Sequence, residues 1–236
     1  MQTYNFIEGE VLLINKPYDW TSFDVIGNVR NYIKKSLDVK KIKVGHAGTL
    51  DPLASGLLIV CTGKFTKKID EYQAQEKEYT ATFTIGATTQ SHDLEKVIDK
   101  YYDYSYVTDE MIFETARKFT GTQEQIPPVF SAVKIDGKRA YDYARNEENV
   151  FIQPKTITIS EIEVLKIELP EIHLRIVCSK GTYIRALARD FGEALNCGAY
   201  LSSLCRTRIG NFYLKNALEI DELKSAIDFQ IAENLI

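Results

Sequence analysis

Residues 45–56 carry the side chains best suited to chemistry in this chain. This segment, here called the glycine loop, holds three glycines, Gly45, Gly48 and Gly56. Its side chains for chemistry are those of His46 and Asp51, and it leads directly into the apolar run 57–61. Glycines let a backbone adopt unusual dihedral angles and let a ligand approach closely. A carboxylate on such a loop, at the edge of a buried strand, is well placed to meet a substrate. An ordinary tight turn that begins at Asp51 is the alternative interpretation.

Periodic apolar residues predict the elements that hold the glycine loop. Residues 11–14 and 57–61 are short apolar runs, as expected of buried strands, and residues 79–85 alternate between apolar residues and threonine. Ser22 is predicted to cap a helix whose apolar residues recur at helical spacing up to Ile33. The loop is therefore expected between a helix and a strand.

The rest of the chain alternates irregularly between strands and helices. Residues 90–107 are acidic and rich in tyrosine, which predicts a surface connection, and Thr108 is predicted to cap a helix. Two strands are expected within 151–169 and another over 172–178, followed by a helix over 184–195 with Arg185 off its apolar stripe. This order lacks the repeating units of a doubly wound sheet.

Length and composition set the broad class. A chain of 236 residues fits one large domain or two small ones. No apolar run approaches the roughly 18 residues that span a membrane, and no secretory signal is visible at the start. The four cysteines show no metal-ligand spacing and are interpreted as reduced thiols. These features predict a cytoplasmic protein.

Charge is unevenly distributed, although the formal net charge is −4. Phosphate binding depends on the local field rather than on the sum of charges. Two basic segments flank the predicted functional motifs, and they contain Arg30, Lys34, Lys35, Lys40, Lys41 and Lys43 in the first and Lys180, Arg185, Arg189, Arg206 and Arg208 in the second. We interpret them as a phosphate-binding face; solvated surfaces are the alternative.

Motifs for other chemistries are incomplete. Residues 62–66 suggest a phosphate-binding loop, but Phe65 follows Lys64 and Leu58 replaces the required upstream glycine. The three histidines stand apart from one another and from the cysteines, which argues against a metal site. We expect neither a metal nor a nucleotide cofactor.

The segment GHAGTLDPLASGLL resembles the catalytic motif of the TruB family of bacterial tRNA pseudouridine(55) synthases. The resemblance runs from about residue 9 to residue 225, and further blocks follow in the family's order at residues 15–17, 77–79, 126–134, 137–141, 178–185, 198–201 and 204–210. It implies an α+β pseudouridine synthase fold, in which helices and loops flank a mixed, largely antiparallel sheet around one catalytic cleft.

The resemblance also implies a domain organisation and a substrate. We expect residues 1–236 to form a single catalytic domain without the C-terminal PUA domain that many relatives carry. The expected activity is the isomerisation of uridine 55 in the T arm of tRNA, without a cofactor. Guide-RNA-dependent relatives rely on the PUA domain, so no guide RNA is expected.

Three residues take catalytic roles by this resemblance. Asp51 is the expected nucleophile or electrostatic stabiliser; attack on C6 of the base, attack on C1′ and elimination to a glycal all remain open. Arg185 is expected to pair with Asp51 and keep it ionised. Tyr79 offers a ring that stacks on the extruded base and a hydroxyl that can relay the C5 proton.

Further residues are expected to contact the RNA. His46 matches a residue at the pocket mouth and Leu204 one that packs against the base; a loop histidine and a core leucine are the respective alternatives. Lesser candidates, for loop packing or RNA backbone contact, are Lys16, Tyr141, Arg206 and Arg208. One departure is Gln90, which replaces an acid of the family's pattern while Asp93 is retained. Altered contacts to the RNA loop are expected from it.

Two other functions compete with this interpretation. A non-catalytic module that binds or folds tRNA would keep the cleft, but binding alone does not require Asp51, Tyr79 and Arg185 together. A glycoside hydrolase needs paired carboxylates, and no motif supplies a second acid near Asp51.

Overall fold

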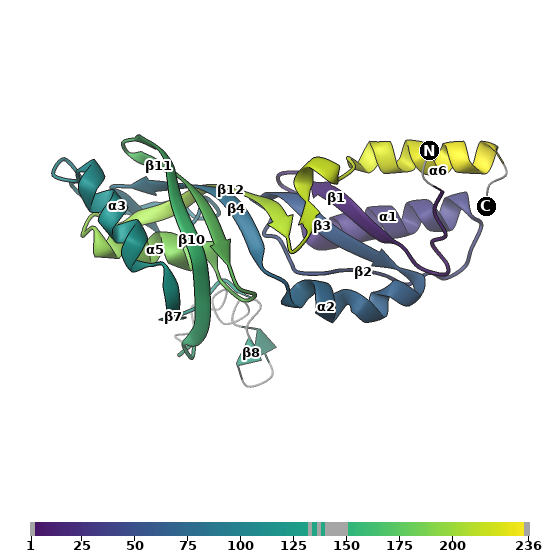
Figure 1. Ribbon diagram of the computed structural model, residues 1–236, viewed down its shortest axis with the longest axis horizontal. Helices are drawn as coiled ribbons and strands as arrows, with labels where there is room; N and C mark the ends of the chain where they lie inside the picture. The colour runs from purple at the N-terminus through teal and green to yellow at the C-terminus, as the bar shows by residue number, and fades with distance from the viewer. Residues whose placement is uncertain (1–2, 132–133, 136–137, 140–150, 234–236) are drawn as a thin grey trace. The chain divides into compact units, whose positions relative to one another are not determined.

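The computed structural model describes residues 3–131, 134–135, 138–139 and 151–233 (Figure 1). Its contacts divide the chain into two compact units, unit 1 with Met1–Glu78 and Cys205–Ile236, and unit 2 with Tyr79–Leu204. Two strands, β4 (Lys77–Ile85) and β12 (Ala199–Ile209), pass from one unit into the other.

Strand β3 (Ser55–Thr62) is the centre of unit 1, and its residues from position 56 onward are buried. Strand β1 (Val11–Lys16) pairs antiparallel with it and places Lys16 opposite Gly56. The short strand β2 (Val44–His46) also pairs antiparallel with β3, whereas β12 pairs parallel with it at Cys205 and Arg206. The strands predicted at 11–14 and 57–61 are confirmed.

Two helices pack their apolar residues into the same core as β1 and β3. Helix α1 (Ser22–Ser36) and helix α6 (Ile220–Ala232) contribute Val25, Ile26, Val29, Ile33, Ile220, Leu223 and Ile227. The prediction that Ser22 caps α1 is wrong, because Thr21 occupies that position in a capping box with Asp24. The hydroxyl of Ser22 is used elsewhere, in the glycine loop.

Shorter elements complete unit 1. A 3-10 helix η1 (Gly63–Lys68) and helix α2 (Ile69–Ala74) follow β3. After β12 come strand β13 (Phe212–Tyr213), which pairs with it antiparallel, and the 3-10 helix η2 (Leu214–Asn216).

Antiparallel pairing dominates unit 2. Strand β10 (Lys155–Glu168) pairs with both β7 (Gly121–Gln125) and β11 (Glu171–Cys178). The sequence predicts two strands here, broken near Pro154 and Ser160, but the structure has one. The chain absorbs Ser160 in a β-bulge, because the register with β11 shifts between Ile159 and Glu161.

Helices α3 (Asp109–Lys118) and α5 (Ile184–Ala194) belong to unit 2, and Thr108 caps α3 as predicted. Phe191 of α5 packs edge-on against Phe83 of β4. The acidic stretch 90–107 is more than a connection, because it contains β6 (Ile98–Tyr101), which pairs with the preceding strand β5 (Ala87–Thr89). Two further strands, β8 (Lys134–Ile135) and β9 (Lys138–Arg139), pair with each other.

The predicted class is confirmed for the residues described: the fold is α+β, with a mixed, largely antiparallel set of strands. Within this part of the chain, no helix is long and apolar enough to cross a membrane. The assignment of residues 1–236 to a single catalytic domain stays a prediction.

Candidate active site

The glycine loop of unit 1 folds around the side chain of Arg206, which β12 supplies. This side chain is buried, with 1% of the residue exposed. Its Nε donates to the carbonyl of Leu57 at 2.7 Å, Nη2 to Gly48 at 3.1 Å and Nη1 to Thr49 at 3.4 Å. A buried charge is tolerated when such hydrogen bonds replace water. Arg206 therefore connects the glycine loop, at Gly48 and Thr49, to Leu57 of β3.

Lys16, the last residue of β1, is a second buried cation under the same loop. Its Nζ donates to the carbonyls of Trp20 at 2.5 Å, Pro17 at 2.8 Å and Pro52 at 3.3 Å. Burial lowers the pKa of Lys16 to about 8; the nearby Asp51 opposes this shift, whereas Arg206 adds to it. Lys16 therefore lies within electrostatic reach of both Asp51 and Arg206.

Asp51 itself lies between two anchored neighbours. On one side, the hydroxyl of Ser22 accepts from the amide of Leu50 at 2.9 Å and donates to its carbonyl at 3.1 Å. On the other, the carbonyl of Pro52 accepts from Lys16 and from the amide of Asp19. The Asp51 residue is half-buried. The loop thus holds one carboxylate on a fixed backbone in a positive local field.

Gly56 makes the close approach of strand and loop possible. Its φ is +105°, and a Cβ at this position would lie 2.4 Å from the carbonyl oxygen of Arg206. Only glycine avoids both the left-handed strain and this contact. The parallel pairing of Arg206 with Gly56 depends on that missing side chain.

His46 lies at the start of the glycine loop, at the end of β2. Its ring meets that of Phe23 edge-on, with centroids 5.5 Å apart. Burial and the charge of Arg206 lower the pKa of His46. The imidazole is therefore neutral at neutral pH, and it offers a ring rather than a charge.

Arg185 is buried in unit 2, although the sequence places it off the apolar stripe of its helix. Its residue is 5% exposed, its Nε lies 3.5 Å from Oδ2 of Asp93, and its Nη2 donates to the carbonyl of Phe130 at 3.1 Å. Asp93 is equally buried. Sequence reasoning noted Asp93 only as a retained acid; the structure makes it a partner of Arg185.

The field around this pair is positive as well. His92 precedes Asp93, and burial together with the charges of Arg189 and Arg185 lowers its pKa to about 4. Its backbone adopts a positive φ of 60°, and its carbonyl accepts from the amide of Leu201 in β12. The loop that carries Asp93 is thereby attached to a strand.

Tyr79 and Leu204 are the first and last residues of unit 2, and each is 8% exposed. Asp51, in contrast, belongs to unit 1. The meeting of Asp51 with Tyr79 and Arg185 in one site therefore stays a prediction.

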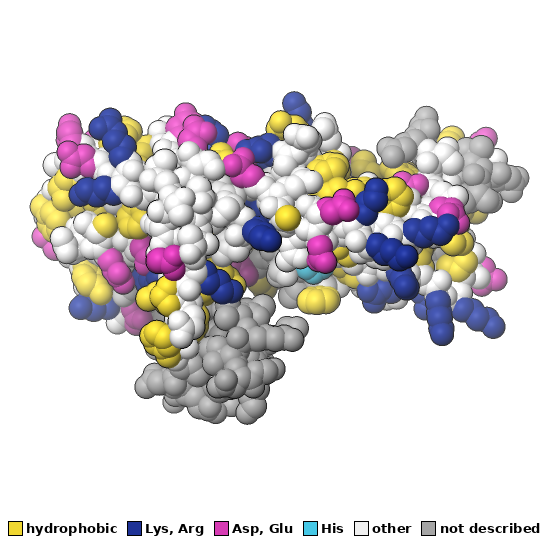
Figure 2. All heavy atoms as spheres, turned by 60° about the horizontal axis from the view of Figure 1, so that its bottom comes forward, with side chains coloured by type: hydrophobic (Ala, Val, Ile, Leu, Met, Phe, Trp, Pro, Cys, Tyr) yellow, Lys and Arg dark blue, Asp and Glu magenta, His cyan; other side chains and the backbone are white. Residues whose placement is uncertain are grey.

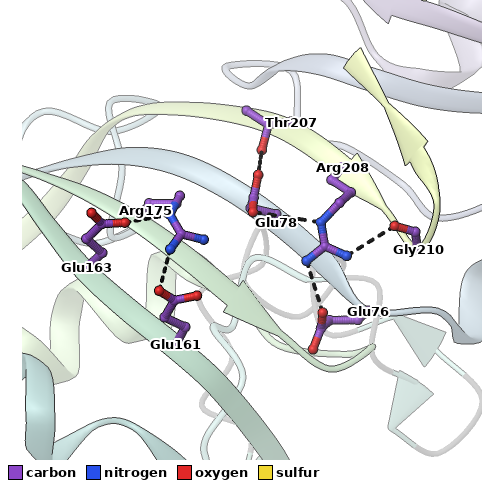
Figure 3. A network of polar contacts seen from close by, with 8 residues as sticks. All are labelled: Glu76, Glu78, Glu161, Glu163, Arg175, Thr207, Arg208 and Gly210. Carbon is purple, nitrogen blue, oxygen red and sulfur yellow. Dashed lines mark hydrogen bonds and ion pairs between the residues drawn. The ribbon is translucent and has the colours of Figure 1, made fainter. Parts of the chain in front are cut away.

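The lesser candidates differ in their surroundings. Arg208 lies in a polar network, in which it contacts Glu76 at 3.0 Å, Glu78 at 3.7 Å and the carbonyl of Gly210 at 3.1 Å (Figure 3). Thr207 donates to the same Glu78. These contacts, like those of Arg206 and Lys16, suit packing rather than RNA contact. Tyr141 lies outside the described residues.

The two basic segments also differ. In the second one, Arg185 and Arg206 are buried. The first belongs to α1 and the chain that follows it, and Figure 2 shows Lys and Arg side chains gathered over the surface of unit 1. The phosphate-binding face is thus better placed on the first segment. Among the residues that the structure describes, no cluster of histidine, cysteine or acidic side chains suits a metal ion.

Comparison with known families gives two matches. The model of the TruB family pseudouridylate synthase (N terminal domain) matches residues 34–184, and that of the tRNA pseudouridylate synthase B C-terminal domain matches residues 185–234. This division falls at a different place from the boundaries of the two compact units.

Curated relatives match over almost their whole length. The tRNA pseudouridine synthase B of Phocaeicola vulgatus is 57% identical over 98% of this chain and 99% of that protein. The protein of the same name from Bacteroides fragilis is 55% identical over 97% of this chain and 98% of its own. That of Flavobacterium johnsoniae is 52% identical over 93% and 96%, respectively.

Solved structures give a more distant match. A chain in the crystal structure of a Cbf5-Nop10-Gar1 complex is 29% identical, with a TM-score of 0.73 over 97% of this chain. One in an H/ACA RNP bound to a substrate RNA containing 2′-deoxyuridine is 27% identical, with a TM-score of 0.69 over 96%. This chain spans 57% and 56% of those two chains.

The first prediction concerns Gly56. We expect Gly56→Ala to unfold at lower urea concentration than Gly121→Ala, a control whose φ of +116° is similar but whose Cβ would meet nothing within 4 Å. The control should lose about 1–2 kcal/mol of unfolding free energy, and Gly56→Ala about 1–3 kcal/mol more, because the added atom overpacks the site. Equal losses would show that the contact with Arg206 relaxes freely.

The second prediction concerns Lys16, whose pKa falls from 10.5 to about 8 on folding. Between these values the unfolded chain binds more protons, so the free energy of unfolding contributed by this group rises with pH. Relative to Lys16→Met, the wild type should gain on the order of 1 kcal/mol between about pH 8 and about pH 10 in urea titrations. Parallel pH profiles would contradict the shift.

Proposed function

Since this chain belongs to the TruB family of pseudouridylate synthases, we propose that it isomerises uridine 55 in the T arm of tRNA to pseudouridine. The chain is an isomerase that acts on RNA uridine, and its curated relatives bear the name tRNA pseudouridine synthase B. The observation that carries the choice of catalytic residue is the anchoring of Asp51 between two buried cations, Lys16 and Arg206.

The reaction breaks the bond between N1 of uracil and C1′ of the ribose and forms one between C5 and C1′. The proton leaves C5 and N1 gains one, so product and substrate are isomers and no co-reactant is consumed. The target base lies within folded RNA, and its extrusion costs a few kcal/mol. The protein must supply contacts that offset this cost.

Asp51 is the proposed catalytic residue. A carboxylate can form a covalent bond to carbon or stabilise positive charge that develops at C1′. Either role requires an anion held in a fixed position. The charges of Lys16 and Arg206 favour that anion, and their hydrogen bonds to the loop carbonyls hold its backbone in place before the substrate arrives.

Residues of unit 2 complete the proposed site. Arg185 is expected to pair with Asp51; within unit 2 it contacts Asp93. Tyr79 is expected to stack on the extruded base and to relay the proton from C5. His46, a neutral ring, and Leu204 are the proposed contacts to the RNA loop and to the base.

We further propose that the substrate is tRNA alone, without a guide RNA, in the cytoplasm. The supporting observation is that the relatives that match this chain over nearly their full length bear the name tRNA pseudouridine synthase B.

The third prediction tests the function and Asp51 together. Purified wild-type protein, incubated with unmodified tRNA transcript, should produce pseudouridine at position 55 when the RNA is mapped chemically. Asp51→Asn should lower single-turnover rates by about four orders of magnitude, as the removal of a catalytic residue does, and should leave tRNA binding within about twofold because its shape is kept.

Asp70→Asn, which removes an exposed acid of α2, is the matched control and should react at the wild-type rate. Pseudouridine at another position would overturn the assignment of uridine 55. Turnover of Asp51→Asn at the control's rate would exclude Asp51, and RNA binding by the wild type without product would favour the non-catalytic alternative.

The fourth prediction concerns Arg185. Removal of one partner of a buried ion pair costs about 3–5 kcal/mol, because the other charge is left unpaired. Arg185→Ala should therefore lower single-turnover rates more than Arg185→Lys, which keeps the charge but loses the fork geometry. Arg175→Lys, a change in a surface cluster with Glu161 and Glu163, serves as the control (Figure 3). Wild-type rates for both Arg185 variants would place this residue outside the site.

A further inference from the structure

A groove runs along the first half of α1, beside the glycine loop. It is a shallow hollow of about 550 Å³, open to solvent and lined by Asp19, Trp20, Phe23, Asp24, Gly27, Asn28 and Asn31. None of these residues has a role in the proposed reaction, and all of them belong to unit 1.

The groove is attached to the backbone that carries Asp51. The carbonyl of Trp20 accepts from Nζ of Lys16, which also donates to Pro52, and the amide of Asp19 donates to the same proline carbonyl. Phe23 meets the ring of His46 edge-on. A group bound in the groove is therefore held next to the glycine loop.

Gly27 borders the groove in the middle of α1. Glycine in the middle of a helix is less favourable than alanine. The packing of the protein does not require it here, because a Cβ at Gly27 would meet nothing within 4 Å. The free space above Gly27 is the groove itself.

The walls of the groove suit a flat ring. Phe23 is an aromatic side chain with 65% of its surface exposed, and the half-buried Trp20 lines the same groove. Nucleic-acid bases stack on such rings irrespective of sequence.

The polar groups of the groove select against phosphate. Its lining includes two aspartates and two asparagines, and neither lysine nor arginine. Oδ1 of Asn28 is buried and has no hydrogen-bond partner among the described residues. Carboxylate and amide oxygens accept from the amino groups of adenine, cytosine and guanine. Uracil has no amino group.

We propose that this groove binds one unpaired, amino-bearing base of the substrate RNA, next to the uridine that reacts. This inference rests on the proposed function, since it assumes an RNA whose loop reaches Asp51. Stacking on Trp20 and Phe23 supplies affinity, and the exposed carboxylate of Asp19 supplies preference for an amino group. The bound base anchors the RNA loop while the uridine is extruded.

The test uses Trp20, which is the single tryptophan of the chain. A T-arm hairpin RNA is titrated into wild type, Gly27→Ala and Gly27→Leu while the intrinsic fluorescence is recorded. Both substitutions favour the helix, but only leucine fills the groove. Wild type and Gly27→Ala should show the same quenching; Gly27→Leu should lose it and bind the RNA about 5- to 100-fold more weakly.

A second arm identifies the base. In a set of hairpins, each loop base is removed in turn. One of these hairpins should fail to quench the tryptophan fluorescence of wild type and of Gly27→Ala. The same hairpin should bind wild type, Gly27→Ala and Gly27→Leu with similar affinity. Equal quenching and affinity for Gly27→Leu and Gly27→Ala would overturn the groove. So would a required base without an amino group.

The same samples separate this inference from the proposed function. Pseudouridine formation by the wild type, with no difference between the Gly27 variants, overturns the groove and leaves the function intact. The opposite result is also possible. If the wild type shows quenching that Gly27→Leu loses, but forms no pseudouridine at position 55, the groove is supported and the proposed function is overturned.

Discussion

The glycine loop depends on the burial of one guanidinium group. An ionised side chain is costly to remove from water unless its hydrogen bonds are replaced, and Arg206 finds its replacements in the carbonyls of Gly48, Thr49 and Leu57. The loop must therefore curve around the side chain. The parallel pairing of β12 with β3 brings the arginine there, and Gly56 lets the two strands approach.

Both units contain buried cations whose donors are satisfied by protein oxygen atoms. In unit 1, the side chains of Lys16 and Arg206 donate to carbonyl oxygens, and the charge of Asp51 partly offsets the effect of burial on Lys16. In unit 2, Arg185 meets a carboxylate of its own, Asp93, as well as a carbonyl.

Local patterns predicted most elements, and tertiary contacts decided the rest. The strands around 11–14, 57–61 and 79–85 follow from apolar periodicity. This pattern is read from the local sequence and does not depend on what each strand packs against. Ser22 and Thr21 are equally good caps by residue type; the loop's amide at Leu50 takes the hydroxyl of Ser22 and leaves the cap to Thr21. The burial of Arg185 was not predictable, because its partner lies far away in the sequence.

Helix α1 explains how a chain with a net charge of −4 can hold RNA. The arginines at 185 and 206 are buried against protein groups, so phosphate contacts fall to exposed cations elsewhere. The last turn of α1 carries Lys34 and Lys35, and its first turn carries Asp24, an arrangement that the helix dipole favours at both ends. If the groove takes a base, one helix separates two tasks: its acidic, aromatic first half meets a base, and its basic last turn meets phosphate.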